Sequence, residues 1–231
     1  MAAVSPPRPP SLREGGDAPP KVRPVTCRMF ETPLIEAFSR VHPAAPFVFW
    51  TPFLFYFLYR AYDGGLALAV IPVAVLAGVL LWSITEYVLH RFVFHRITGT
   101  FAGRRLYFVL HGVHHDYPTD GSRLVMPLGV SIPMGTAVYL LLRVALAPLG
   151  GAVIDAVFVG FGIGYLAYDG IHYATHHFRM KSKLGSWLKR YHMVHHHTGE
   201  NARWGVSSPL WDWVFGTMGE TTQKTATVVD R

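Results

Sequence analysis

The sequence predicts an all-α integral membrane protein with four transmembrane helices and a cytosolic helical cap that is rich in histidine. Three observations predict this fold. Only 15% of the residues are charged, whereas soluble domains carry about 25%. Hydrophobic residues make up 51% of the chain and gather in long runs. The 13 histidines all lie outside these runs.

The segment before the first apolar run is expected to divide into a tail and a short helix. The first residues are rich in proline and lack the apolar stretch of a signal peptide, which predicts a disordered tail. Leu34, Ile35 and Phe38 then follow at helical spacing, which predicts an amphipathic helix on the membrane surface or a helix packed on the core. We expect four parts in chain order: a tail over 1–28, an interfacial helix over 29–42, the membrane domain over 43–219 and a C-terminal tail over 220–231.

Four apolar runs predict the membrane spans, at 44–62, 66–82, 125–147 and 151–167. The second run has no ionisable group and approaches the roughly 20 residues that a spanning helix needs. We expect this helix to continue to His95, a length of about 45 Å. The hydrocarbon layer is only about 30 Å thick, so the last turns should project beyond it. The fourth helix should project likewise through "YDGIHYATHH".

The basic residues predict the orientation of the spans. All but two of the 21 Lys and Arg side chains, Arg60 and Arg143, fall on one side of a four-span arrangement. The positive-inside rule makes that side cytoplasmic, with both termini and the histidines there and the "DGG" and "PLGG" turns opposite. The net charge of +7 then reflects topology and attraction to anionic lipids, not nucleic-acid binding. Such a protein belongs in a bacterial cell membrane or the endoplasmic reticulum.

The histidines recur at spacings that place them on common helix faces. "HGVHH" and "HMVHH" share the pattern HxxHH, and each set points within an arc of about 100°. His172 and His176 are four residues apart on one face. His90 and His95 are about 140° apart on a regular helix, so they can share a site only if the helix bends or more than one metal is present. Three histidines lie outside these sets: His42, His177 and His197.

So many imidazoles in one place would repel each other on protonation, whereas metal ions require the neutral base. Ligands that are all nitrogen suit iron, zinc, copper or nickel, and ten exceed what one ion binds, so we expect a dimetal site. Glu86 and Asp169 lie on faces suited either to accepting an imidazole N–H or to bonding at helix ends. The candidate ligands are His90, His95, His111, His114, His115, His172, His176, His192, His195 and His196.

The motifs "EYVLHRFVFH", "HGVHHDYPTDGSRLVMP", "GYLAYDGIHYATHH", "YHMVHHHTG" and "GVSSPLWDWVFGT" resemble, in this order and spacing, the fatty acid hydroxylase superfamily, which includes sterol desaturases. The similarity spans roughly residues 82–218 and is greatest to the fatty acid 2-hydroxylase branch. It implies an O2-dependent monooxygenase with two iron ions, which zinc is able to replace, bound by the ten histidines. It also implies a membrane lipid substrate, a fatty acid or ceramide-like sphingolipid hydroxylated at C2. The fused cytochrome b5 domain of many relatives is missing here, so we expect a separate electron donor of cytochrome b5 or ferredoxin type.

Other readings of the same residues stay open. The cage could oxidise a sterol, a carotenoid or another lipid, or introduce a double bond. A metal transporter is the remote alternative, because transporters place polar ligands near the bilayer midplane, where these spans are apolar. Asp116, Asp120 and Arg123 suit either a lipid headgroup or pairing within the protein. Three tryptophans suit the headgroup level: Trp204, Trp211 and Trp213. Of these, Trp211 either flanks a lipid entrance or anchors the chain.

Overall fold

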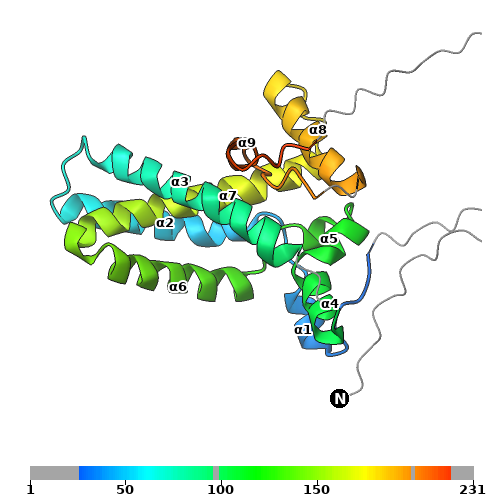
Figure 1. Ribbon diagram of the computed structural model, residues 1–231. Helices are drawn as coiled ribbons and strands as arrows, with labels where there is room; N and C mark the ends of the chain where they lie inside the picture. The colour runs from blue at the N-terminus through cyan, green and yellow to red at the C-terminus, as the bar shows by residue number, and fades with distance from the viewer. Residues whose placement is uncertain (1–25, 96–98, 199–200, 220–231) are drawn as a thin grey trace, which may run out of the picture.

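The computed structural model describes residues 26–95, 99–198 and 201–219, and these residues form helices and connections without a strand. Of the tails expected over 1–28 and 220–231, residues 1–25 and 220–231 lie outside the described residues, whereas residues 26–28 are described. Figure 1 shows an elongated bundle with a cap at one end. Four long helices run along the bundle: α2 (Ala45–Asp63), α3 (Ile71–Val88), α6 (Leu128–Ala145) and α7 (Gly151–His177).

Helix α7 is the centre of the bundle, because 72% of its most apolar stretch is buried, compared with 17% for α6. It packs closely on α3 where two glycines meet. A Cβ added to Gly78 would lie 2.0 Å from the Val157 carbonyl oxygen, and one added to Gly160 would lie 1.9 Å from that of Val75. Small residues allow the backbones of membrane helices to approach in this way. Replacing either glycine would push α3 and α7 apart.

Three described segments are long and apolar enough to cross a membrane: Ile71–Phe94, Gly121–Ala145 and Gly151–His177. The chain is therefore a membrane protein. Helix α2 has 19 residues and packs along α7, but its prolines, its several tyrosines and Arg60 lower its mean hydropathy. Helix α2 is therefore not among the three candidates. Three of the four predicted spans are found by length and apolar composition among the described residues.

The second span differs from the expected single helix over 66–95. Regular α-helix begins only at Ile71, and at Leu89 it widens into a π-helix, η1 (Leu89–Phe94). Pro72 stands in the first turn of α3, where its fixed φ suits the helix and its missing N–H costs nothing. The apolar run therefore predicts the span but not where it begins.

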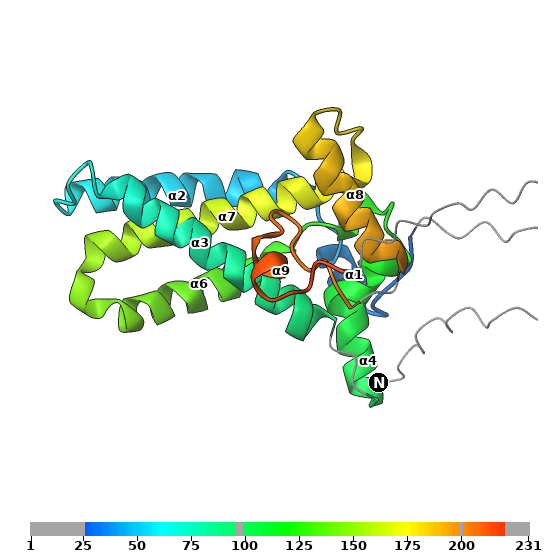
Figure 2. The ribbon, with the colours of Figure 1, turned by 45° about the horizontal axis from the view of Figure 1, so that its top comes forward.

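The cap gathers the short helices at one end of the bundle (Figures 1 and 2). The helix expected over 29–42 extends only over α1 (Pro33–Phe38). The turns at Gly65 and Gly150, where φ is +81° and +84° and glycine is favoured, lie at the opposite end of the bundle in Figure 1. The other cap elements are α4 (Phe101–Tyr107), η2 (Phe108–Gly112), α5 (Val113–Asp116), η3 (Gly121–Arg123), α8 (Lys183–Thr198) and α9 (Leu210–Val214), while the short η4 (Ala147–Leu149) belongs to the far turn.

Candidate metal centre

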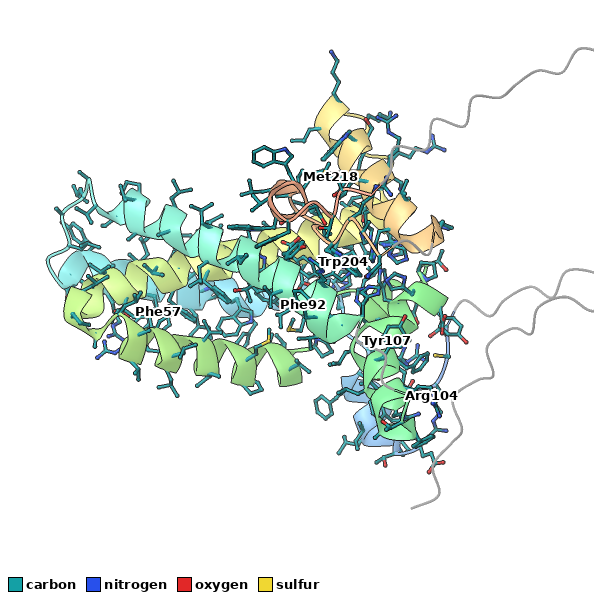
Figure 3. The ribbon with its side chains drawn as sticks, viewed as in Figure 1. Phe57, Phe92, Arg104, Tyr107, Trp204 and Met218 are labelled. Carbon is teal, nitrogen blue, oxygen red and sulfur yellow. The ribbon has the colours of Figure 1, made fainter. Side chains whose placement is uncertain are left out.

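Ten histidines lie together where the cap meets the bundle, and they form two groups of five. In each group, one ring nitrogen of every histidine lies within 4.8 Å of the others. Figure 3 shows nitrogen-bearing rings crowded beside the labelled Trp204. All ten candidate ligands are therefore brought together. The first group is His90, His95, His111, His115 and His195, and the second group is His114, His172, His176, His192 and His196.

A π-helix sets the geometry of the first group. In η1, the amide of His95 lies 3.3 Å from the His90 carbonyl and donates to it, five residues back. A π-helix bonds residues i and i+5, so residues five apart return to one face. The Nε2 atoms of His90 and His95 are 3.2 Å apart. The separation of about 140° expected on a regular helix is therefore removed by one widened turn.

Each HxxHH motif is divided between the two groups. His111 and His115 belong to the first group, whereas His114 between them belongs to the second. On α8, His195 belongs to the first group, and its neighbours at 192 and 196 belong to the second. Each HxxHH motif therefore supplies ligands to both groups.

In the first group, the donor nitrogens are close enough to share one ion. The Nε2 atom of His90 lies 3.1 Å from that of His111, and the Nε2 atom of His195 lies 3.2 Å from that of His95. The buried Nε2 of His115 has no hydrogen-bond partner within the described residues. Two ligand nitrogens that lie about 2.1 Å from one ion, at a right angle, are about 3 Å apart. The residues present therefore fit a nitrogen-bound metal.

The second group is built on regular helix faces. His172 and His176 lie four residues apart on α7, and so do His192 and His196 on α8. The Nε2 atoms of His176 and His192 are 2.9 Å apart, as are those of His172 and His114. These separations match those in the first group, so the same metal chemistry fits both.

Backbone carbonyls orient two imidazoles of the first group. His90 Nδ1 bonds to the Trp204 carbonyl, and His195 Nδ1 lies 2.9 Å from the carbonyl of Ala202. An N–H donated from Nδ1 leaves the Nε2 lone pair free for a metal. Residue types do not reveal backbone acceptors, so the sequence could not indicate this support. We call residues 201–208 the carbonyl loop.

None of the described imidazoles donates to Glu86 or Asp169, the two carboxylates for which an imidazole contact was one of two alternatives. Glu86 Oε1 accepts the amides of Val206 at 2.7 Å and Ser207 at 2.9 Å, so it holds the carbonyl loop. Asp169 is buried beside Tyr165, and none of the described imidazoles donates to its oxygens. Helical angle places a residue on a face without identifying which group reaches it first.

Asp212 is a supporting residue that the sequence interpretation missed. It is fully buried, and its carboxylate accepts the amides of Trp204 at 2.9 Å and Gly205 at 2.7 Å. It also accepts the hydroxyl of Thr217 at 2.8 Å. The motif "WDWVFGT" contains this aspartate, so the signal was present, but the role required the loop to be seen.

The remaining predicted site residues take defined positions. Arg123 is 8% exposed and pairs within the protein, which is one of the two alternatives left open. Trp211 lies on α9 and donates from Nε1 to the Ser83 hydroxyl of α3 at 2.9 Å. Trp204 is only 2% exposed and is enclosed by protein, whereas Trp213 is 73% exposed.

The three histidines set aside in the sequence lie outside both groups. His42 Nδ1 accepts the Ala44 amide at 3.2 Å. The His177 ring stacks on Tyr173, with centroids 4.4 Å apart. His197 is exposed, and its Nδ1 lies 2.8 Å from the Met193 carbonyl.

Burial keeps the cap imidazoles neutral. Desolvation, followed by the charges of neighbouring imidazoles, lowers the pKa of His111, His114 and His192 well below the ordinary value. The same causes lower the pKa of His95 to about 3 and of His115 to about 2. Neutral imidazole is the form that binds a metal. The cage is therefore ready for metal near neutral pH without losing protons.

An apolar cavity of about 430 Å³ adjoins the histidines, within the usual size range of ligand sites. His111, His114 and His172 form part of its wall. Most of the remaining wall is apolar, from α1, η1, η2, α6 and α7. A long apolar molecule in this cavity would have one end beside the histidines.

Comparisons with known proteins agree with this arrangement. The profile of the family described as fatty acid hydroxylase matches residues 75–217. The dihydroceramide fatty acyl 2-hydroxylase FAH2 of Arabidopsis thaliana is 36% identical over 204 residues, which cover 85% of this chain and 83% of that protein. The fatty acid 2-hydroxylase of Homo sapiens is 34% identical over 223 residues, which cover 86% of this chain and 58% of that protein. This chain thus spans little more than half the length of the human protein.

A solved structure shares the fold. Full-length scs7p, of which only the hydroxylase domain is visible, matches with a TM-score of 0.72 and 32% sequence identity. The match covers 79% of this chain and 69% of that chain. These findings confirm the resemblance that the motifs indicate.

Proposed function

The chain belongs to the fatty acid hydroxylase family, and on this basis we propose that it hydroxylates long acyl chains at C2. The substrate is a membrane lipid, either a fatty acid or a ceramide-like sphingolipid. The relatives at 34% and 36% identity are named as 2-hydroxylases of fatty acids and of dihydroceramide acyl chains. The observation that carries the proposal is the pair of five-histidine groups beside an apolar cavity of about 430 Å³.

We propose that each histidine group holds one iron ion, and that O2 is the co-substrate. Zinc is expected to occupy the same sites in overexpressed protein, because imidazole binds it well. When bound, two iron ions would supply O2 activation and hydrogen removal from an alkyl carbon, which no side chain can do alone. The ten neutral imidazoles would bind and orient the ions. The carbonyl loop holds two of these imidazoles, those of His90 and His195, through their Nδ1 atoms.

The cavity would place the acyl chain and exclude water. Its apolar walls favour a hydrocarbon chain, because burying apolar surface is favourable. The histidines at its wall would then lie beside the first carbons if the polar end of the lipid points toward the cap. That arrangement selects a carbon near the carboxyl or amide group rather than one at mid-chain.

We propose four spans, with the cap and both termini in the cytoplasm. Helix α2 supports the fourth span because its 19 residues lie along the central helix α7. The basic residues gather on the cap side, as the positive-inside rule expects. Labelling of Leu68→Cys and Leu149→Cys, at exposed positions near the far turns, in a Cys27→Ser background tests this map. Labelling from the cytoplasmic side would overturn it.

Insertion of one oxygen atom from O2 requires two electrons, so we propose a separate donor protein of cytochrome b5 or ferredoxin type. The basic surface around α8 would attract an acidic donor, because opposite charges speed association. Five cationic residues support this proposal: Arg179, Lys181, Lys183, Lys189 and Arg190. Turnover that persists when each candidate donor is removed from a purified system would exclude that donor.

Mass spectrometry of lipids tests the reaction. Cells with and without the gene are compared under air and under isotopically labelled O2. Label at C2 of acyl chains, absent without the gene, is the expected result. Label on a sterol or carotenoid ring, or a new double bond without label, would overturn the substrate assignment. Metal uptake without any oxidised lipid would indicate a transporter.

A further inference from the structure

A short segment of the cap, residues 26–41, forms part of the cavity wall, and we call it the strap. Both of its ends bond to the loop before α6. The Thr26 hydroxyl donates to Asp120, and the Val41 amide donates to the Ser122 carbonyl at 2.8 Å. Met29 packs in a small apolar cluster with Phe108 and Val113. The strap is thus fastened to the cap rather than to the bundle.

One buried guanidinium holds the strap from within. Arg123 Nη2 lies 2.6 Å from Glu36 Oε1 and 2.9 Å from the Cys27 carbonyl, while Nη1 lies 2.9 Å from the Ser39 hydroxyl. Its side chain is 1% exposed. Three contacts along the strap meet at one cation, and the planar fork of arginine suits such a junction better than lysine does.

Glu36 links this clasp to the turn before α1. Its Oε2 accepts the amides of Met29 at 2.9 Å and Phe30 at 3.1 Å, so the ion pair with Arg123 also fixes the extended part of the strap. Removing Arg123 would leave Glu36 with the more exposed Arg40, 3.1 Å away, as its remaining described ion-pair partner, and would remove the buried half of the clasp. The position of α1 therefore depends on Arg123.

The other face of α1 is apolar and exposed. Ile35 and Phe38 line the cavity although they are 49% and 73% exposed. Two residues from the adjoining spans do the same: Val93 of η1 is 42% exposed, and Val130 of α6 is 44% exposed. Side chains that both line a cavity and reach the surface mark its mouth. This mouth is apolar and lies between α1, η1 and the start of α6.

The surroundings of the mouth indicate lipid rather than water outside it. η1 and α6 belong to two of the three candidate membrane spans. Phe92, labelled in Figure 3, is a further exposed apolar residue on η1, at 52%. Arg40 on the strap, 37% exposed, pairs with Glu36 at 3.1 Å and so belongs to the contacts that hold the strap.

We propose that this mouth is the lateral entrance through which the acyl chain of a bilayer lipid reaches the histidines, with Arg123 as the positioning residue that holds its strap wall. The inference rests on the proposed function for the identity of the lipid. It gives the strap a role in substrate access rather than membrane anchoring alone.

Leu34 provides a matched control on the same helix. It is 66% exposed but does not line the cavity. Phe38→Asp and Leu34→Asp are compared in phosphatidylcholine vesicles that contain ceramide. A carboxylate is unfavourable among apolar groups, so we expect Phe38→Asp to raise KM about tenfold with metal content unchanged. Leu34→Asp should leave KM within about twofold of the wild type, since the residue faces away from the cavity. Equal effects of the two variants, or no effect of Phe38→Asp, would overturn the entrance.

A binding measurement separates this inference from the proposed reaction. A photoreactive ceramide in the same vesicles should cross-link to the wild type and to Leu34→Asp, and much less to Phe38→Asp. If no lipid is oxidised but this difference holds, the reaction fails and the entrance stands. If lipid is oxidised and all three proteins cross-link equally, the entrance fails and the reaction stands.

Cys27 is the sole cysteine of the chain and reports on the strap directly. It is partly buried, and burial raises the pKa of its thiol. Arg123→Gln should release the strap, so we expect Cys27 to react with a maleimide about tenfold faster and KM to rise with metal content unchanged. Arg123→Lys should restore KM only in part. Arg104→Gln is the control for loss of charge, because Arg104 is exposed and its side-chain bond within the described residues is to the Gly99 carbonyl, away from the strap. Unchanged labelling in Arg123→Gln would disprove the clasp, and faster labelling with unchanged KM would disprove its role in access.

Discussion

The two histidine groups have equivalent donors, but different structures hold their imidazoles. In the first group, His90 and His195 donate from Nδ1 to the carbonyl loop. That loop contains no helix, and two carboxylates bond to its amides, those of Glu86 and Asp212. The first group therefore depends on a chain of contacts that runs from the carboxylates of Glu86 and Asp212 through the carbonyl loop to the imidazoles.

The second group depends on regular helices. The buried Nδ1 atoms of His114, His172 and His192 have no hydrogen-bond partner within the described part of the chain. Four of its five histidines lie on i, i+4 faces of α7 and α8. Helix packing, rather than a loop carbonyl, orients the rings of His114, His172 and His192 within the described residues. The comparison teaches that two histidine groups with equivalent donors can differ in what would damage them, and variants can separate the two.

Removal of a ligand should have the largest effect and should act on one group at a time. His111→Ala and His115→Ala should each lose the metal of the first group, and His192→Ala and His196→Ala that of the second. Every one of these variants should lose turnover, because the reaction is proposed to need both ions. Elemental analysis of purified protein, paired with lipid turnover, measures both outcomes.

His42→Ala and His197→Ala serve as controls, since both residues lie outside the groups. They should keep both metals and most of the activity. Loss of both metals from every ligand variant would mean that the groups are not separable. Equal loss in His197→Ala would show that the assignment of ligands is wrong.

A change in the carbonyl loop should weaken only the first group. Glu86→Gln keeps the shape of the side chain but removes the charge that accepts the amides of Val206 and Ser207. Residues that orient metal ligands typically change metal affinity about 10-fold to 100-fold when replaced. Titration with a chelator should therefore show one metal released earlier than in the wild type and one unchanged. The exposed Glu31→Gln is the control, and an equal shift for both metals would contradict the division.

Acid should not distinguish the groups, because both contain buried neutral imidazoles. In the folded, metal-free protein the pKa of His95 is about 3 and that of His115 is about 2, whereas the unfolded value is about 6.5. Below about pH 6.5 the unfolded chain binds more protons than the folded chain, so stability falls as the pH falls toward 3. At about pH 5.5 each such imidazole should lower the free energy of unfolding by about 1 kcal/mol.

Thermal unfolding of chelator-treated protein in detergent measures this loss. His95→Ala and His196→Ala, one from each group, should each reduce the slope of stability against pH, because burial lowers the pKa of both residues. A melting temperature that rises on acidification would contradict the expected loss of stability. A reduced slope in only one of the two variants would show that the groups differ in acid sensitivity.

Much of this structure follows from local sequence patterns. The features that could not be predicted from such patterns were missed for one common physical reason. Long apolar runs and histidines at i, i+4 spacing identify α3, α7 and the ligand set, because those patterns repeat along one helix. The widened turn of η1 was not predictable, since helical angle assumes a constant turn. Nor were the Trp204 carbonyl and the clasp at Arg123, which depend on contacts between distant segments. The apolar mouth beside α1 could not be predicted either, because it depends on the widened turn of η1 and on the clasp at Arg123.

The smallest effect concerns Trp211, for which a place beside a lipid entrance was one of two alternatives, and which can now be compared with Phe38. Its Nε1 donates to the Ser83 hydroxyl, and it does not line the cavity. Trp211→Phe keeps a ring but removes that bond, which should cost about 1 kcal/mol. The melting temperature should fall by a few degrees, and KM should stay unchanged. Trp213→Phe, at a position 73% exposed, should change neither quantity. An increase in KM for Trp211→Phe without a change in melting temperature would place a second lipid contact on α9, and the mouth beside α1 would then be only one of two routes.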